Sequence, residues 1–260
     1  MQVRVSRKAF ALGLCAGALL GMNPRAFAQR AADKQPQRIH ISVTKVKPDM
    51  VRTFEALVKN EVIPAQKKGG TQARYTWQTA LFGESYEYVT AYPIGQMAQY
   101  DEPSPLTKAL GREQAADLGS RLRNCYESNH SYVVMLRRDL SIESGSSETP
   151  KMATVTTVRV VPGKALEFES FVKSEILPVM KKAGLKDYWA HQTMLGGDPN
   201  EYVILSLIPN MAELDRPSPA IRVLGREGWL KLTGKIAGVV ASVDTTVSRF
   251  VPELSFMPAQ

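Results

Sequence analysis

Residues 38–140 show alternating and helical patterns of apolar positions in a regular order. Alternation between apolar and polar residues predicts strands at Arg38–Lys45, Arg74–Phe82, Tyr86–Ile94 and His130–Arg137. Between the first two strands, apolar residues that recur at helical spacing predict a helix. A second helix is predicted to begin at Ser104-Pro105, where a capping hydroxyl precedes a proline. The order is therefore strand, helix, strand, strand, helix, strand.

The same order returns without a gap after a shift of 114 residues. Pro103-Ser104-Pro105 falls on Pro217-Ser218-Pro219, and Leu110-Gly111-Arg112-Glu113 falls on Leu224-Gly225-Arg226-Glu227. The second set of strands is predicted at Met152–Val160, Tyr188–Leu195, Glu201–Ile208 and Ala241–Phe250. Self-similarity of this length indicates a duplicated domain.

The first 28 residues have the pattern of a secretory signal peptide. Basic residues precede an apolar stretch, and Ala26-Phe27-Ala28 matches a cleavage site. The apolar stretch is too short to span a bilayer, so we expect no membrane anchor. We expect a periplasmic or secreted protein, with the Sec and twin-arginine export routes both open. The parts of the chain are a signal peptide (1–28), an N-terminal segment (29–37), a first repeat (38–140), a Ser/Glu-rich linker (141–151), a second repeat (152–251) and a tail (252–260).

Cleavage of the signal peptide is directly measurable. Intact-mass spectrometry of the exported protein is expected to give a chain that begins at Gln29. A mass that still includes Met1–Ala28 would contradict the prediction.

Net charge indicates no polyanionic partner once the signal peptide is removed. The chain carries 33 Lys+Arg and 25 Asp+Glu, a net charge of +8. Four of the basic residues lie in the signal peptide and no acidic residue does, so 8 - 4 leaves +4. The rest of the chain has no Arg-rich tract or RNA-binding signature, and we predict no nucleic-acid partner. Motifs for nucleotide binding, serine hydrolases and zinc proteases are absent from the sequence.

The order βαββαβ is that of a ferredoxin-like domain. With a first helix that ends in Lys-Lys-x-Gly at Lys67 and again at Lys181, the duplicated chain resembles the dimeric α/β-barrel superfamily. That group includes antibiotic-biosynthesis monooxygenases, NIPSNAP-like proteins and haem proteins of the chlorite dismutase type. The resemblance implies an α+β fold in which two tandem ferredoxin-like repeats form one intramolecular barrel.

Strand alternation predicts which side chains face the interior of that barrel. The candidate ligand-binding residues on this face are His40, Trp77, Tyr88, Tyr92, His130, Tyr132, His191, Tyr202 and Asp244. A lining of aromatic rings with a few polar groups is typical of a small-molecule pocket. Buried Tyr and His residues also serve structure alone, by packing and hydrogen bonding. The histidines lack the short spacing of metal ligands, so we predict no metal site.

Three functions remain open from the sequence. The first is an exported protein, monomeric or weakly oligomeric and without a cofactor, that holds a partly apolar or aromatic small molecule between its two sheets. The second, implied by the resemblance, is a cofactor-independent monooxygenase or isomerase, with His191, His40 or Tyr88 as catalytic candidates. The third is haem binding. Haem members of the superfamily place an axial His on a helix, whereas all three histidines here are predicted on strands.

Overall fold

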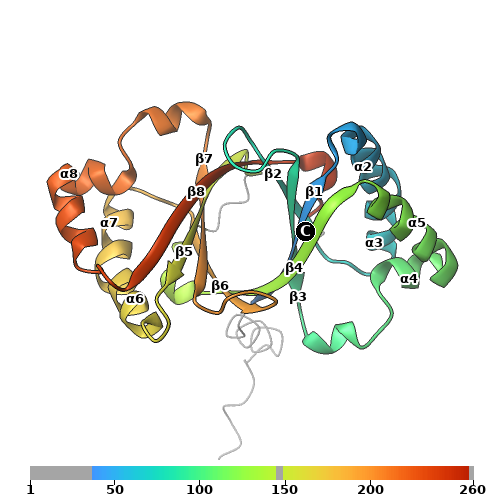
Figure 1. The fold of residues 1–260 in the computed structure, drawn as a ribbon, viewed down its shortest axis with the longest axis horizontal. Coiled ribbons are helices and arrows are strands. Elements are labelled where there is room, and N and C mark those ends of the chain that lie inside the picture. The colour runs from blue at the N-terminus through green and yellow to red at the C-terminus, as the bar shows by residue number, and fades with distance from the viewer. Residues whose placement is uncertain (1–36, 145–148, 258–260) are drawn as a thin grey trace, which may run out of the picture. The chain divides into compact units, whose positions relative to one another are not determined.

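The computed structural model describes residues 37–144 and 149–257, so the predicted signal peptide lies outside the described residues. The first repeat contains strands β1 (Arg38–Val46), β2 (Tyr75–Thr79), β3 (Glu87–Ile94) and β4 (Tyr126–Leu136). The second contains β5 (Met152–Val160), β6 (Tyr188–Leu195), β7 (Glu201–Ile208) and β8 (Val240–Phe250). Together they close into one antiparallel barrel in the order β1-β3-β2-β8-β5-β7-β6-β4 (Figure 1).

Each repeat supplies four neighbouring strands, and the last strand of each repeat pairs with the second strand of the other at the two junctions. Strand β4 of the first repeat pairs with β6, and β8 of the second repeat pairs with β2. Closure removes every free sheet edge, which a single ferredoxin-like sheet would leave exposed. The predicted α+β barrel with two repeats is confirmed.

Helices cover the outside of the barrel in two groups, one for each repeat (Figure 1). The first group is α2 (Val51–Leu57), α3 (Ile63–Lys68), α4 (Pro105–Leu110) and α5 (Arg112–Asn124); the second is α6 (Ala165–Phe171), α7 (Leu177–Lys182) and α8 (Pro219–Gly234). Short 3-10 segments lie at Pro48–Met50, Met97–Tyr100, Arg138–Leu140, Met211–Asp215 and Pro252–Leu254. Apolar side chains such as Phe54 and Phe168 pack each group of helices against its sheet. No helix among the described residues is long and apolar enough to cross a membrane.

The first helix of each repeat continues through its proline. A π-helical turn, Val58–Val62 or Val172–Ile176, precedes Pro64 or Pro178. Proline has no N–H to donate to the preceding turn, and the wider π turn accommodates that missing hydrogen bond. The helices therefore run on to their Lys-Lys pairs.

The repeated Leu-Gly-Arg-Glu block breaks the second helix. Gly111 and Gly225 have φ values of 81° and 71°, a backbone region that favours glycine. In the first repeat this break separates α4 from α5. Arg112 and Glu113, which follow the break, are exposed on the outer helix. The block therefore has a structural role.

Two strand boundaries differ from the predicted ones by more than one residue. Strand β2 ends at Thr79, and Leu81 and Phe82 beyond it are 72% and 62% exposed. Strand β4 begins at Tyr126, four residues early, because it pairs with β1 as far as Val46. Long-range pairing decides both ends, and local residue preference does not report it.

Candidate functional site

Strand register shows which side chains enter the barrel. Trp77 pairs with Val89 on one side and Phe250 on the other, and with Ala153 it forms an interior cluster. Ladder partners point to the same face of a sheet. Interior positions therefore include five candidates, Trp77, His130, Tyr132, His191 and Asp244. Of these, His130 and Asp244 are exposed and Trp77 is buried.

The other four candidates, His40, Tyr88, Tyr92 and Tyr202, face the helices. Tyr88 packs 5.0 Å from the Phe54 ring and donates a 2.7 Å hydrogen bond to Glu55 on α2. Tyr202 repeats this arrangement with Phe168 and Glu169. His40 and Tyr92 are ladder partners in the same register as Tyr88, so they share its face.

The interior placement predicted for these four residues was wrong for a physical reason. Strands β1 and β3 are covered on both faces, by helices outside and by the opposite sheet inside. Alternation separates two faces but does not say which one is the interior when both are covered. Aliphatic residues such as Ile41 and Val89 take the interior, while the tyrosine hydroxyls reach carboxylates that the helices supply.

His191 is held neutral inside the barrel. Burial lowers its pKa to about 4. Its Nδ1 lies 3.3 Å from the Val203 carbonyl oxygen, which can only accept, so Nδ1 carries the proton and Nε2 is an acceptor. The nearby Thr193 hydroxyl is buried and has no hydrogen-bond partner in the described part of the chain. Burial also raises the pKa of the Tyr132 hydroxyl to about 12.

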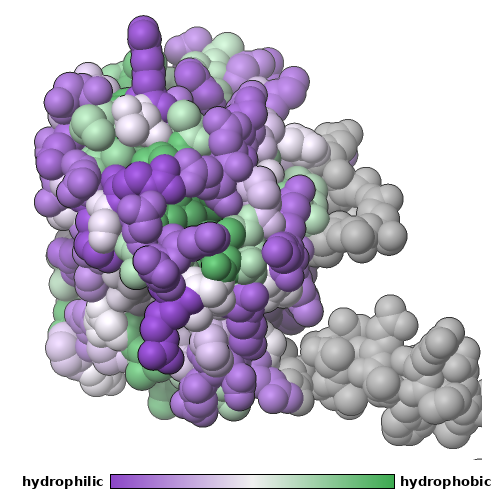
Figure 2. Space-filling view, turned by 90° about the vertical axis from the view of Figure 1, so that its right-hand side faces the viewer, coloured by the Kyte–Doolittle hydropathy of each residue, from purple (hydrophilic) through white to green (hydrophobic). Residues whose placement is uncertain are grey.

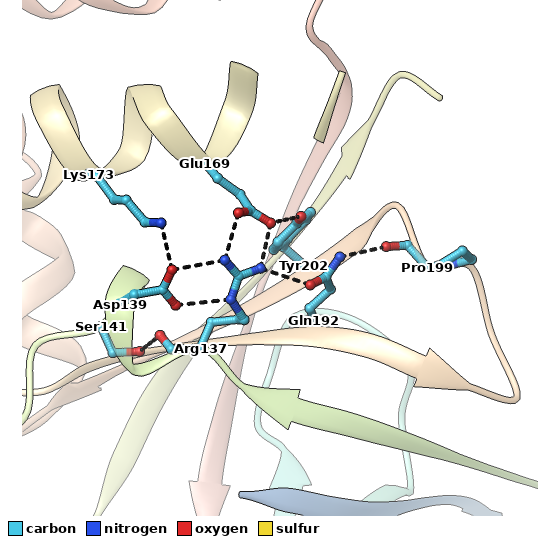
Figure 3. Close-up of polar contacts among 8 residues, drawn as sticks. All are labelled: Arg137, Asp139, Ser141, Glu169, Lys173, Gln192, Pro199 and Tyr202. Carbon is cyan, nitrogen blue, oxygen red and sulfur yellow. Dashed lines mark hydrogen bonds and ion pairs between the residues drawn. The ribbon is translucent and has the colours of Figure 1, made fainter. Parts of the chain in front are cut away.

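An ion-pair network joins the end of β4 to the helices of the second repeat (Figure 3). Arg137 donates to Glu169 at 2.6 Å and to Asp139 at 2.9 Å, and Lys173 reaches Asp139 at 2.7 Å. Hydrogen bonds from Arg137 hold the pKa of both carboxyl groups below their usual range. Every charge in the network has an opposite partner, so we interpret the network as a structural link that holds the two repeats together.

A second polar cluster lies between the first sheet and its helices, and there a cation has no anionic partner. Arg74 is 4% exposed. Its Nε donates to the Leu254 carbonyl oxygen at 2.9 Å, and its other nitrogens donate to the hydroxyls of Tyr92 and Thr90 and to the Gln66 amide oxygen. All four acceptors are neutral. Within residues 37–144 and 149–257, no carboxylate forms an ion pair with this guanidinium.

Aromatic side chains extend this cluster to the surface. The His40 ring lies 5.8 Å from the Tyr92 ring, and its Nδ1 is 3.1 Å from the Tyr100 hydroxyl. Burial lowers the pKa of His40, and Tyr100 is 49% exposed. We call Arg74, Tyr92, His40 and Tyr100 the Arg74 cluster. The sequence interpretation included His40 and Tyr92 but missed Arg74, although a charged residue at the start of a buried strand was a usable signal.

The second repeat has no equivalent of this cluster. At the 114-residue shift, neutral residues replace its members: Thr154, Tyr188, Ser206 and Leu214. Tyr188 is 6% exposed and packs in the apolar core of its repeat. One repeat therefore forms the same fold without these polar groups.

No three His, Cys, Asp or Glu side chains of the described residues come close enough together to hold a metal ion. All three histidines lie on strands, as predicted: His40 on β1, His130 on β4 and His191 on β6.

Comparisons with known proteins define a fold class. No family model and no curated protein matches the chain. A solved putative monooxygenase from Lactobacillus acidophilus is 12% identical with a TM-score of 0.55, and covers 83% of this chain and 94% of its own. A second, from Fusobacterium nucleatum, is 9% identical with a TM-score of 0.58, over 84% of this chain and 93% of that one.

A mutant chlorite dismutase from Candidatus Nitrospira defluvii, in complex with cyanide, is 8% identical with a TM-score of 0.53, over 87% of this chain and 96% of its own. At such identities the likeness concerns the fold alone. The chain has the dimeric α/β-barrel fold, with both halves of the barrel supplied by one polypeptide.

Proposed function

We propose that this chain is an exported small-molecule-binding protein whose ligand site is the Arg74 cluster. The observation that carries the proposal is a buried guanidinium surrounded only by neutral acceptors. A buried charge without a counter-charge is costly, and an arginine stays protonated in proteins. An anionic group bound beside Arg74 would reduce that cost.

The surrounding residues favour an aromatic or partly apolar ligand. The Tyr92 and Tyr100 rings offer flat apolar faces, and their hydroxyls offer hydrogen bonds. Such a combination is typical of sites that bury most of a small ligand and orient it by a few polar groups. The ligand class is therefore an aromatic carboxylate or a similar organic anion, bound on the helix side of the first sheet rather than inside the barrel.

Two pKa shifts favour binding over catalysis. A general base works best when its pKa lies near the working pH. Burial lowers the pKa of both His40 and His191, the latter to about 4, which makes both imidazoles weaker bases. They serve better as neutral hydrogen-bonding groups than as proton acceptors in a reaction.

A calorimetric titration with 2-naphthoate and its neutral amide, 2-naphthamide, tests the proposal. We expect the wild-type protein to bind the carboxylate at least about tenfold more tightly, because charge-assisted hydrogen bonds contribute about 1.5–3 kcal/mol. Arg74→Gln is expected to abolish this preference. The matched control is Tyr188→Phe, at the equivalent position of the second repeat, which should keep the preference.

Equal affinities for the two compounds in the wild-type protein would overturn the proposal. Circular dichroism of Arg74→Gln establishes whether the variant folds. Oxygen consumption or product formation during the titration would instead support the enzyme interpretation, and a Soret band in the purified protein would establish haem binding.

A further inference from the structure

The two repeats have nearly the same geometry where each last strand meets the helices of the other repeat. Ser141 donates to the Arg137 carbonyl oxygen at 2.7 Å, and Ser255 donates to the Val251 carbonyl oxygen at 2.8 Å. Each serine hydroxyl also accepts from a backbone N–H of the adjoining strand, at 3.0 Å and 2.8 Å. Val251 therefore occupies in the first repeat the position that Arg137 occupies in the second.

The anionic groups that surround Arg137 are also present at Val251. Glu55 corresponds to Glu169, and each accepts a hydrogen bond from a buried tyrosine hydroxyl, at 2.7 Å and 2.8 Å. Glu253 corresponds to Asp139 at the same shift. What differs is the cation, because valine cannot supply a guanidinium. Among the described residues, neither Glu55 nor Glu253 forms an ion pair.

A cavity borders Val251, the position that Arg137 occupies in the second repeat. Its volume is about 460 Å³, and its walls include Glu55, Glu253, Val251, Arg52 and Lys59. Small-molecule sites commonly have volumes of about 300–1,000 Å³. This side of the molecule, where α2 lies, is largely hydrophilic, with apolar side chains visible in the middle (Figure 2). The cavity is thus accessible, sized for a small ligand and carries the acidic groups that hold Arg137 in the other repeat.

We infer that this cavity binds the guanidinium group of a ligand, held by Glu55 and Glu253 as Glu169 and Asp139 hold Arg137. Two observations carry the inference independently: the equivalent residues bind a guanidinium in the second repeat, and a cavity lined by Glu55, Val251 and Glu253 lies in the first. Planar guanidinium matches carboxylate pairs better than ammonium does, because it donates through a rigid fork.

The positive charges on the cavity wall define the ligand further. Lys59 corresponds to Lys173, which lies beside Asp139 in the Arg137 network, so a lysine here is compatible with a bound guanidinium. Arg52 is an additional cation, because Leu166 is its equivalent. A ligand that also carries a carboxylate would pair with Arg52 while its guanidinium meets Glu55. The ligand class is therefore a guanidino acid, such as an arginine-like compound.

Calorimetric titration with L-arginine and L-citrulline tests this inference, since citrulline replaces the guanidinium by a neutral urea of similar shape. We expect the full mature protein to bind arginine at least about tenfold more tightly than citrulline. Glu55→Gln is expected to weaken arginine binding at least about tenfold while still accepting the Tyr88 hydrogen bond. Glu227→Gln, an exposed change of the same charge on α8, is the control and should leave binding unchanged.

A filling variant gives a second, independent test. Val251→Arg is expected to place a guanidinium between Glu55 and Glu253, which would abolish arginine binding and raise the thermal unfolding temperature. Arginine binding that persists in Val251→Arg would overturn the inference, as would equal affinities for arginine and citrulline in the wild-type protein.

A further titration distinguishes a small guanidino acid from an arginine side chain of a partner protein. The blocked peptide acetyl-Gly-Arg-Gly-amide carries the same group without a free carboxylate next to it. Tighter binding of free arginine supports a small guanidino acid, as proposed. Tighter binding of the peptide would overturn the guanidino-acid assignment and identify an arginine side chain of a partner protein as the occupant. Because Arg74 is unchanged in every variant, failure here is distinguishable from failure of the naphthoate experiment.

Discussion

Arg137→Ala is expected to lower the free energy of unfolding by about 3 kcal/mol, the largest effect of a single substitution that we predict. The variant leaves the Glu169 carboxylate, whose side chain is 13% exposed, without its guanidinium partner. Asp139 also loses its pair with Arg137 and would retain only Lys173. Removing one member of a buried pair costs more than the pair contributes, because the remaining charge stays desolvated.

Urea denaturation followed by circular dichroism measures this change. The matched control is Arg121→Ala, which breaks another bidentate pair between an arginine and a helical glutamate, Glu61. That pair is exposed, 43% and 41% for its two side chains, so the expected loss is below about 1 kcal/mol. Similar losses in both variants would contradict a special role of the Arg137 network.

The Arg137 effect should depend on pH in a defined direction. Hydrogen bonds from Arg137 lower the pKa of Asp139 and Glu169 in the folded state. A carboxyl group with a lowered folded pKa stabilises the fold above its unfolded pKa, about 4, and loses this contribution as the pH falls through the folded value. The stability difference between wild type and Arg137→Ala is therefore expected to be full at pH 7 and to shrink below about pH 4. A difference that stays constant to pH 2 would contradict it.

Gly69→Ala is expected to destabilise the protein by about 2–3 kcal/mol, the usual cost of forcing extra volume into a packed contact. A Cβ atom at Gly69 would lie 2.0 Å from the Pro105 carbonyl oxygen, so the end of α3 and the start of α4 would have to separate. The backbone at Gly69 has φ of -82°, which any residue adopts, and the predicted cost is therefore steric.

Thermal or urea unfolding measures the effect, with Gly234→Ala as the matched control. A Cβ atom at Gly234 would meet nothing within 4 Å, and alanine favours helices more than glycine does. The control is expected to be neutral or slightly stabilising. The second repeat already has Ala183 at the position equivalent to Gly69, so the close contact belongs to the first repeat alone. An unchanged stability of Gly69→Ala would show that α3 and α4 move apart easily.

Some features of the candidate sites followed from strand patterns and others did not. Trp77 and His191 were predicted on the interior face, and the register places them there. Tyr88 and Tyr202 were predicted on the same face but lie against the helices. The reason is physical: when a strand is covered on both sides, either face can hold aromatic residues. The alternation therefore shows which residues share a face, but not which face is the barrel interior.

The Arg74 cluster and the cavity at Val251 depend on contacts between residues far apart in the chain. Arg74 donates to a carbonyl oxygen 180 residues away, and Glu55 lies near Val251 only because β8 pairs with β2 of the first repeat. No local spacing reports such neighbours. The 114-residue shift aligns Arg137 with Val251, but the carboxylates around Arg137 come together only in the folded chain (Figure 3).

By itself, the sequence determined the duplication, the order of strands and helices, and the α+β class, because hydrophobic periodicity and repeated capping residues are local properties of the chain. Tertiary structure alone decided which strands pair at the two junctions between the repeats, which face of each strand is interior, and where charges are paired. These depend on barrel closure, which brings β4 to β6 and β8 to β2 and so joins the end of each repeat to the helices of the other.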